Sequence, residues 1–178
     1  MSEQTSSGVM AGKRGLIMGV ANDRSIGWGI ASKLAEHGAE LAFTFQGEAL
    51  QKRVIPLAES VGSNLVLPCD VTDEASVDAV FDRLKSEWGE LDFVLHAIAY
   101  SDKEELKGGY VDTSRDNFQR TMDISVYSFT EITRKATAMM KDGGSLLTLT
   151  YYGAERVMPH YNAVSYTHLR AHETVDYR

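Results

Sequence analysis

A glycine-containing turn near the N-terminus could bind the phosphates of a dinucleotide. The turn runs from Gly19 to Gly29 and separates a short apolar run from a segment with apolar residues at helical spacing. Glycine at position 19 lets backbone approach a pyrophosphate, and the N-terminus of the following helix offers free N–H groups and a positive dipole. The alternative is a tight turn in which Gly27 and Gly29 only allow close helix packing. Because the turn comes first in a series of strand–helix units, the nucleotide is favoured.

Polar residues further along the chain could bind the adenosine half of such a cofactor. The second expected strand ends at Gln46, where an acidic residue commonly holds the ribose hydroxyls and an arginine favours a 2′-phosphate. Gln46 is neutral, and Lys52 and Arg53 are expected on the solvated face of the next helix, so the sequence favours NADH over NADPH. Asp70 follows the third expected strand. It is expected either near the adenine amino group or as a cap of the helix that follows.

Tyrosines after the fifth expected strand could supply a proton. Tyr151, Tyr152 and Tyr161 follow that strand, and the carboxyl ends of parallel strands line the ligand crevice. A phenol there can donate a proton to a developing oxyanion. Aromatic packing is the alternative for each tyrosine, and only the combination with the nucleotide turn predicts a site. The histidines show no pair at metal-ligand spacing with a carboxylate between them, so we expect no metal site.

Apolar strands alternate with helical segments along the chain, and this pattern predicts an α/β fold with a doubly wound parallel sheet of the Rossmann type. The expected strands cover residues 15–20, 41–45, 65–67, 93–99 and 145–150. The expected helices cover residues 26–37, 48–61, about 72–88 and 114–140, with a loop over 101–113. We expect a flexible N-terminus over residues 1–12, a partial dinucleotide-binding domain over 13–164 and a different tail over 165–178.

Composition limits the classes of partner. A chain of 178 residues fits about one domain at roughly 150 residues per domain. The net charge of −7 and the absence of a Lys/Arg cluster argue against a nucleic-acid partner. No apolar run approaches the ~18 residues of a membrane span, so we expect no membrane partner. A single cysteine, Cys69, cannot form an intrachain disulfide, and we expect a cytoplasmic protein.

Several motifs together resemble the bacterial NADH-dependent enoyl-[acyl-carrier-protein] reductases, a divergent branch of the short-chain dehydrogenase/reductase superfamily. A classical ketoreductase carries Asn-Asn-Ala-Gly after the fourth strand and Tyr-x-x-x-Lys after the fifth. Here the fourth strand gives His-Ala-Ile-Ala, and Ser165 stands four residues after Tyr161. The resemblance extends over residues 10 to about 164, and it rests on the segments Gly19–Gly29, Cys69–Val71, His96–Tyr100, Asp123–Ser125 and Leu147–Arg156.

The resemblance implies an activity and a set of site residues. The implied reaction is reduction of a trans-2-enoyl thioester carried on acyl carrier protein, with hydride from NADH and with Tyr161 meeting the enolate oxygen. Tyr151 would flank the substrate, and Ala99 with Tyr100 would form the wall between cofactor and substrate. A homotetramer is implied for the intact family member. The implied cofactor contacts are Gly19, Ser25, Ile26, Gln46, Asp70, Val71, Ala97 and Ile98.

The sequence departs from the family pattern near its C-terminus. The family places a lysine seven residues after the tyrosine that corresponds to Tyr161, and the charge of this lysine holds the nicotinamide ribose. This chain has His168 at that position. Residues 165–178 resemble nothing in the family, which points to a truncated or mis-joined reading frame and to an inactive fragment. The alternative, from another class, is a non-catalytic dinucleotide-binding module that has lost the lysine.

Overall fold

The computed structural model describes residues 8–107 and 109–150. These residues fall into two compact units. The first contains residues 8–97 and 132–147, and the second contains the described residues of 98–131 and 148–150. In chain order the elements are β1 (Arg14–Met18), α1 (Ile26–Glu36), β2 (Glu40–Phe45), α2 (Gly47–Ser60), β3 (Leu65–Pro68), α3 (Glu74–Glu87), β4 (Phe93–His96), η1 (Glu104–Leu106), η2 (Tyr110–Asp112), α4 (Arg115–Met122), the π-helical turn η3 (Asp123–Tyr127), α5 (Ser128–Thr137) and β5 (Ser145–Thr148).

The five strands form one sheet in the order β3-β2-β1-β4-β5. β1 pairs in parallel with both β2 and β4, so that Ile17 lies beside Phe43 on one side and Leu95 on the other. The chain therefore reverses its direction of strand addition at β1, which is the topological switch point of a doubly wound sheet. Ligands of such sheets bind outside the carboxyl ends of the strands at this point. The predicted fold class is confirmed.

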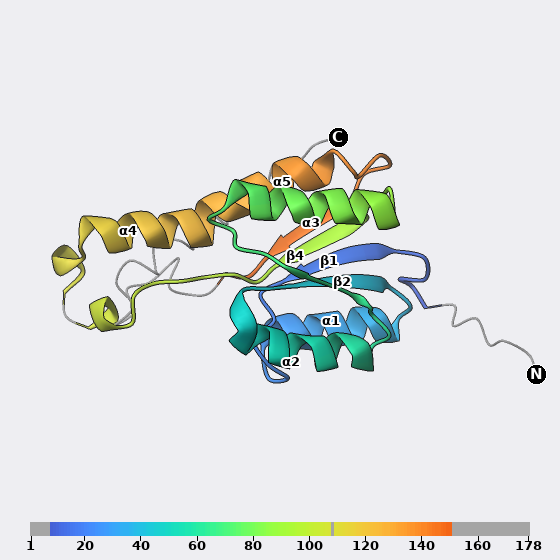
Figure 1. Ribbon diagram of the computed structural model, residues 1–178, viewed down its shortest axis with the longest axis horizontal. Coiled ribbons are helices and arrows are strands. Elements are labelled where there is room, and N and C mark those ends of the chain that lie inside the picture. Colours follow the sequence, from blue (N-terminus) through green and yellow to red (C-terminus); the bar gives the residue numbers. More distant parts are fainter. Residues whose placement is uncertain (1–7, 108, 151–178) are drawn as a thin grey trace, which may run out of the picture. The chain divides into compact units, whose positions relative to one another are not determined.

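Helices cover both faces of the sheet. Figure 1 shows α1 and α2 on one side of the strands, with α3 and the C-terminal half of α5 on the other. Strands covered on both faces are expected to be apolar along their whole length. Leu16, Ile17, Met18 and Phe43 accordingly have no exposed surface, and Leu95 is 1% exposed.

Capping residues define the ends of the helices. The Ser25 hydroxyl accepts a hydrogen bond from the Trp28 N–H (3.3 Å) at the start of α1. The helix stops before Gly38, whose φ of 96° is accessible to glycine at little cost. Both ends agree with the prediction. At α3 the cap is Asp73, which accepts from the Ala75 N–H at 3.0 Å, so the alternative in which Asp70 caps this helix is wrong.

The limits of several predicted elements differ from the observed ones. β4 ends at His96, whereas the sequence predicted residue 99. The prediction was too long because the residues that follow His96 are as apolar as the strand itself. The single helix expected over 114–140 is interrupted by η3, which separates α4 from α5. π turns are rare in proteins, but those that occur are often found at functional sites. β1 and β5 are also shorter at their C-terminal ends than expected, stopping at Met18 and Thr148.

Candidate functional site

The turn after β1 brings backbone from two strands close together. Gly19 has a φ of 91°, a backbone conformation that residues with a Cβ rarely adopt. A Cβ placed on Gly27 would lie 3.3 Å from the Ala97 Cβ and 3.6 Å from the Gly19 carbonyl oxygen. The Ala97 N–H also donates to the Met18 carbonyl at 2.9 Å. Gly19, Gly27 and Ala97 therefore meet at the switch point between β1 and β4, where the sequence predicted cofactor contacts.

Asn22 organises this turn, although sequence reasoning did not select it. Its side-chain oxygen accepts from the Arg24 N–H at 2.8 Å, and its carbonyl accepts from the Ser25 hydroxyl at 2.7 Å. The signal was present, since asparagine favours turns by bonding to backbone two residues ahead. The turn thereby places Ser25 at the start of α1, whose first N–H groups can bind an anion.

The first residue of α1 is apolar and faces solvent. Ile26 is 68% exposed, whereas Val20 in the same turn is only 2% exposed. A single exposed apolar side chain is common on protein surfaces. Its position beside an anion-binding helix N-terminus nevertheless suits contact with the apolar face of a bound nucleotide.

Gln46 and Asp70 meet at the carboxyl ends of β2 and β3. The Gln46 side-chain amide donates to Asp70 Oδ2 at 2.8 Å, and Asp70 Oδ1 accepts from the Thr72 N–H (2.9 Å) and the Thr72 hydroxyl (2.7 Å). The Thr72 N–H is the largest cause that lowers the pKa of Asp70, and the bonds from the Thr72 hydroxyl and Gln46 lower it further. Asp70 therefore remains a carboxylate at neutral pH. Val71, half-buried, follows directly.

The remaining predicted residues lie elsewhere. Ile98, Ala99 and Tyr100 belong to the second unit, in the segment that follows β4. Tyr100 is 41% exposed, and its backbone N–H donates to the Ser125 hydroxyl at 3.0 Å. Tyr151 and Tyr161, the predicted catalytic residues, lie outside the described residues, as does His168.

His96, the last residue of β4, has no exposed surface. Burial lowers its pKa from 6.5 to about 4, because the charged imidazolium is poorly solvated inside the protein. The side chain is therefore neutral at pH 7. Within residues 8–107 and 109–150, no cluster of three His, Cys, Asp or Glu side chains could hold a metal ion.

We expect this histidine to make stability depend on pH. Between pH 6.5 and about 4 the unfolded chain binds a proton at His96 that the folded chain does not bind, so the free energy of unfolding falls as the pH drops through this window. The variant His96→Asn lacks this contribution. Urea unfolding of both proteins over a pH series should show the wild type losing its advantage only inside the window, and parallel profiles would contradict the assignment.

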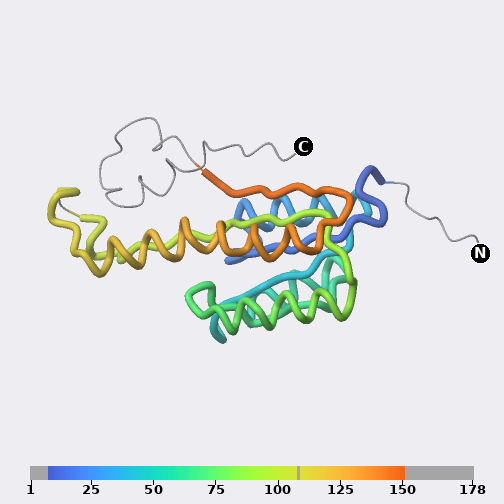
Figure 2. Tube along the Cα trace, turned by 90° about the horizontal axis from the view of Figure 1, so that it is seen from above, coloured from blue at the N-terminus to red at the C-terminus, as the bar shows by residue number. Residues whose placement is uncertain are grey.

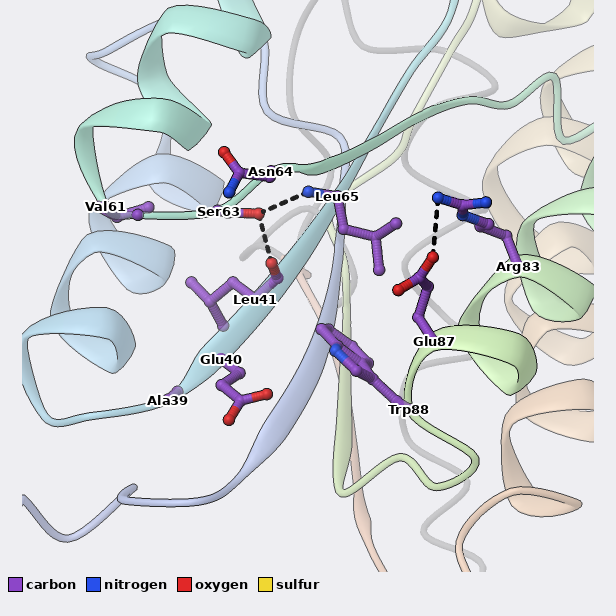
Figure 3. A pocket seen from close by; sticks show the side chains of 11 residues that line it. Ala39, Glu40, Leu41, Val61, Ser63, Asn64, Leu65, Arg83, Glu87 and Trp88 are labelled. Carbon is purple, nitrogen blue, oxygen red and sulfur yellow. Dashed lines mark hydrogen bonds and ion pairs between the residues drawn. The ribbon is translucent and has the colours of Figure 1, made fainter.

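A cavity of about 480 Å³ lies at the other edge of the sheet. Figure 3 shows its lining, with Leu41 and Leu65 from the amino ends of β2 and β3 and Trp88 from the end of α3. The Ser63 hydroxyl donates to the Leu41 carbonyl, and Arg83 pairs with Glu87 at 2.8 Å. None of the predicted site residues lines this cavity.

Among the described residues, no helix is long and apolar enough to cross a membrane.

Comparison with known proteins identifies the family. The family described as Enoyl-(Acyl carrier protein) reductase matches residues 19–173, which is most of the chain. The chain belongs to this family. The predicted resemblance is therefore confirmed, and the family match includes the nucleotide turn, the Gln46–Asp70 pair and the segment after β4. The match ends at residue 173, past the limit of about 164 that the sequence predicted.

Individual members of the enoyl-[acyl-carrier-protein] reductase family are highly similar. Enoyl-[acyl-carrier-protein] reductase [NADH] 1 of Rhizobium meliloti (strain 1021) is 66% identical over 159 residues, covering 89% of this chain and 58% of that protein. The reductase of Anaplasma phagocytophilum, solved in complex with NAD, is 57% identical with a TM-score of 0.87, over 90% of this chain and 62% of that one. The Bacillus cereus reductase, solved with NADP+, is 44% identical with a TM-score of 0.88, over 91% and 64%. The chain thus spans about three fifths of the length of these relatives.

Proposed function

We propose that the protein's activity is reduction of trans-2-enoyl thioesters of acyl carrier protein with NADH, and that the chain of 178 residues, with His168 in place of the family's lysine, is by itself inactive. The observation that carries the proposal is the assembly, at the carboxyl edge of one sheet, of the residues that the family resemblance assigns to the cofactor. Gly19 and Ala97 lie at the switch point, where both pack against Gly27, and Gln46 bonds to Asp70. The relative from Rhizobium meliloti, named as an NADH-dependent reductase, supports the same cofactor.

The described residues fit a dinucleotide. The positive φ of Gly19 turns the backbone beside the N-terminus of α1, whose first N–H groups can bind a pyrophosphate. The missing Cβ of Gly27 lets this helix pack closely against Ala97 and the Gly19 carbonyl. The ionised Asp70 has acceptor capacity for the adenine amino group, and Gln46 lies beside it for the ribose hydroxyls. We assign Ser25, Ile26, Val71 and Ile98 to further cofactor contacts.

The chemistry requires one hydride and one proton. NADH, when bound, supplies a hydride to the β-carbon of the thioester, and the carbon–carbon double bond becomes an enolate. Tyr161 would donate a hydrogen bond to the enolate oxygen as negative charge develops there. A proton that comes ultimately from solvent then adds to the α-carbon and gives the saturated thioester. Tyr151 would flank the substrate, with Ala99 and Tyr100 forming the wall on the cofactor side.

We further propose a cytoplasmic homotetramer whose substrate is carried on acyl carrier protein. The names of the relatives support this substrate carrier, and the acidic composition argues against nucleic acid. We also propose that residues 13–164 form a partial dinucleotide-binding domain and that residues 165–178 do not belong to it.

Two proteins test the proposal. One is the chain of 178 residues, and the other, the extended chain, continues residues 1–164 with the C-terminal segment of the Rhizobium meliloti reductase. We expect both to bind NADH in calorimetric titrations and the extended chain to oxidise NADH in the presence of crotonyl-CoA, a soluble enoyl thioester. NADH binding without reduction by the extended chain would instead favour a non-catalytic dinucleotide-binding module.

A further inference from the structure

The segment that follows β4 has no regular secondary structure, yet its backbone is firmly held. Tyr100, Ser101 and Asp102 lie between β4 and the short helix η1. Backbone N–H and C=O groups outside helices and strands need other partners, because unpaired polar groups are costly. For this segment, three side chains of the neighbouring helix supply bonds, and all of them belong to the second unit.

Ser125 binds both backbone groups of Tyr100. The Tyr100 N–H donates to the Ser125 hydroxyl oxygen at 3.0 Å, and the same hydroxyl donates to the Tyr100 carbonyl at 3.2 Å. One small side chain thus fixes the backbone of this residue on both sides. The Tyr100 side chain is 41% exposed, so its ring remains available to a ligand.

Asn117 and Thr121 hold the next two residues of the segment. The Asp102 N–H donates to the Asn117 side-chain oxygen at 2.9 Å. The Thr121 hydroxyl donates to the Ser101 hydroxyl at 3.1 Å. Asn117 is 6% exposed and Thr121 is fully buried, and buried polar groups cost most when a partner is removed. These bonds therefore define one position for the segment.

Asn117, Thr121 and Ser125, which we call the polar row, are spaced four residues apart. This spacing places Asn117 and Thr121 on one face of α4, and Ser125 continues the row in the π turn η3. Figures 1 and 2 show the segment after β4 running beside α4. The π turn thus carries the residue that binds Tyr100, which is a specific reason for a rare helical geometry at this point.

We propose that the polar row is a positioning element that sets the wall between cofactor and substrate. This inference rests on the proposed function, which assigns Ala99 and Tyr100 to that wall. The hydrogen bonds that join the polar row to the segment after β4 end at Tyr100, Ser101 and Asp102, none of which is assigned to a cofactor contact. Loss of the polar row should therefore weaken turnover of the thioester while leaving NADH binding nearly unchanged.

The first test measures the contact itself in the chain of 178 residues. Amide exchange detected by NMR should become about tenfold faster at Tyr100 in Ser125→Ala, the change expected when one protecting hydrogen bond is lost. Asn117→Leu should have the same effect at Asp102. Ser60→Ala is the matched control, because the Ser60 hydroxyl bonds only within α2, to the Leu57 carbonyl at 2.7 Å, and should leave both amides unchanged.

The second test measures the consequence in the extended chain. Ser125→Ala should lower kcat/KM for crotonyl-CoA by about tenfold, with a change below about twofold in the Kd for NADH. Ser125→Thr keeps the hydroxyl and should restore most of the activity. A residue that only stabilised the fold would lower NADH binding and turnover together, and Ser60→Ala should change neither.

The outcomes separate this inference from the proposed function. If the unsubstituted extended chain reduces no thioester, the proposed function fails, and the amide exchange still decides whether the polar row holds the segment. If it does reduce the thioester and Ser125→Ala has unchanged kcat/KM, or if the Tyr100 amide exchanges at the same rate, the polar row is not a positioning element.

Discussion

Replacement of Tyr161 by phenylalanine is expected to lower kcat for an enoyl thioester by about 100-fold, the lower end of the loss when one hydrogen-bond donor to an oxyanion is removed. The phenol hydroxyl would be needed only as charge develops on the thioester oxygen, so the ground-state complex should lose little. The Kd for NADH should therefore change by less than about threefold. Steady-state kinetics of the extended chain, with calorimetry for NADH, measure both quantities.

Tyr151→Phe provides the matched control for this substitution. Both changes remove one phenolic oxygen from a tyrosine that follows the fifth strand in the sequence, but Tyr151 is proposed to flank the substrate rather than to meet its oxygen. We expect a loss in kcat of less than about tenfold for Tyr151→Phe, consistent with a contact outside the reacting atoms. Equal losses in turnover and NADH binding for Tyr161→Phe would mean that Tyr161 serves packing instead.

NADH is expected to bind at least about tenfold more tightly than NADPH. A tenfold ratio of dissociation constants corresponds to about 1.4 kcal/mol, which repulsion between the Asp70 carboxylate and a 2′-phosphate several Å away can supply. The relatives named as NADH-dependent and the Anaplasma phagocytophilum reductase solved with NAD support this preference, although the Bacillus cereus reductase was solved with NADP+. The proposed role of Gln46 at the ribose hydroxyls also favours NADH. The Asp70 carboxylate lies 2.8 Å from the Gln46 amide and would place negative charge close to a 2′-phosphate bound there. Lys52 and Arg53, which could offset this charge, are exposed on α2.

The substitution Asp70→Asn tests this explanation. It removes the charge while keeping an oxygen that can accept from Gln46, so the ratio of the two dissociation constants should fall towards one. The low pKa of Asp70, caused mainly by the Thr72 N–H, means that the wild-type preference should persist well into mildly acidic solution. Calorimetric titration of both nucleotides measures the ratio. Tighter binding of NADPH by the wild-type chain would overturn the assignment.

The order of strands and helices could be predicted from the sequence because it depends on local patterns. Apolar runs identified the strands, and Gly38 marked the end of α1. The limits of β4 could not be found in this way, since Ala97 to Ala99 are as apolar as the strand itself. The π turn after Met122 also escaped prediction, because its only mark is a step of five between the buried residues Thr121 and Val126 within a segment of otherwise helical composition.

The candidate site was predictable where single motifs determine it and not where distant residues meet. The nucleotide turn follows from its glycines and from its place after the first strand. The bond between Gln46 and Asp70 joins residues 24 positions apart, and that between Ser125 and Tyr100 joins residues 25 apart. Such contacts depend on the register of the whole fold. Likewise, spacing alone did not reveal that Asp73 rather than Asp70 caps α3.

Transfer of deuterium from labelled NADH tests the central claim most directly. The extended chain would be incubated with crotonyl-CoA and NADH that carries deuterium at the transferred position of the nicotinamide, and the acyl product would be analysed by mass spectrometry. The account predicts a saturated thioester with one deuterium at the β-carbon. A product without deuterium there, or no saturated product from an extended chain that binds NADH, would contradict it.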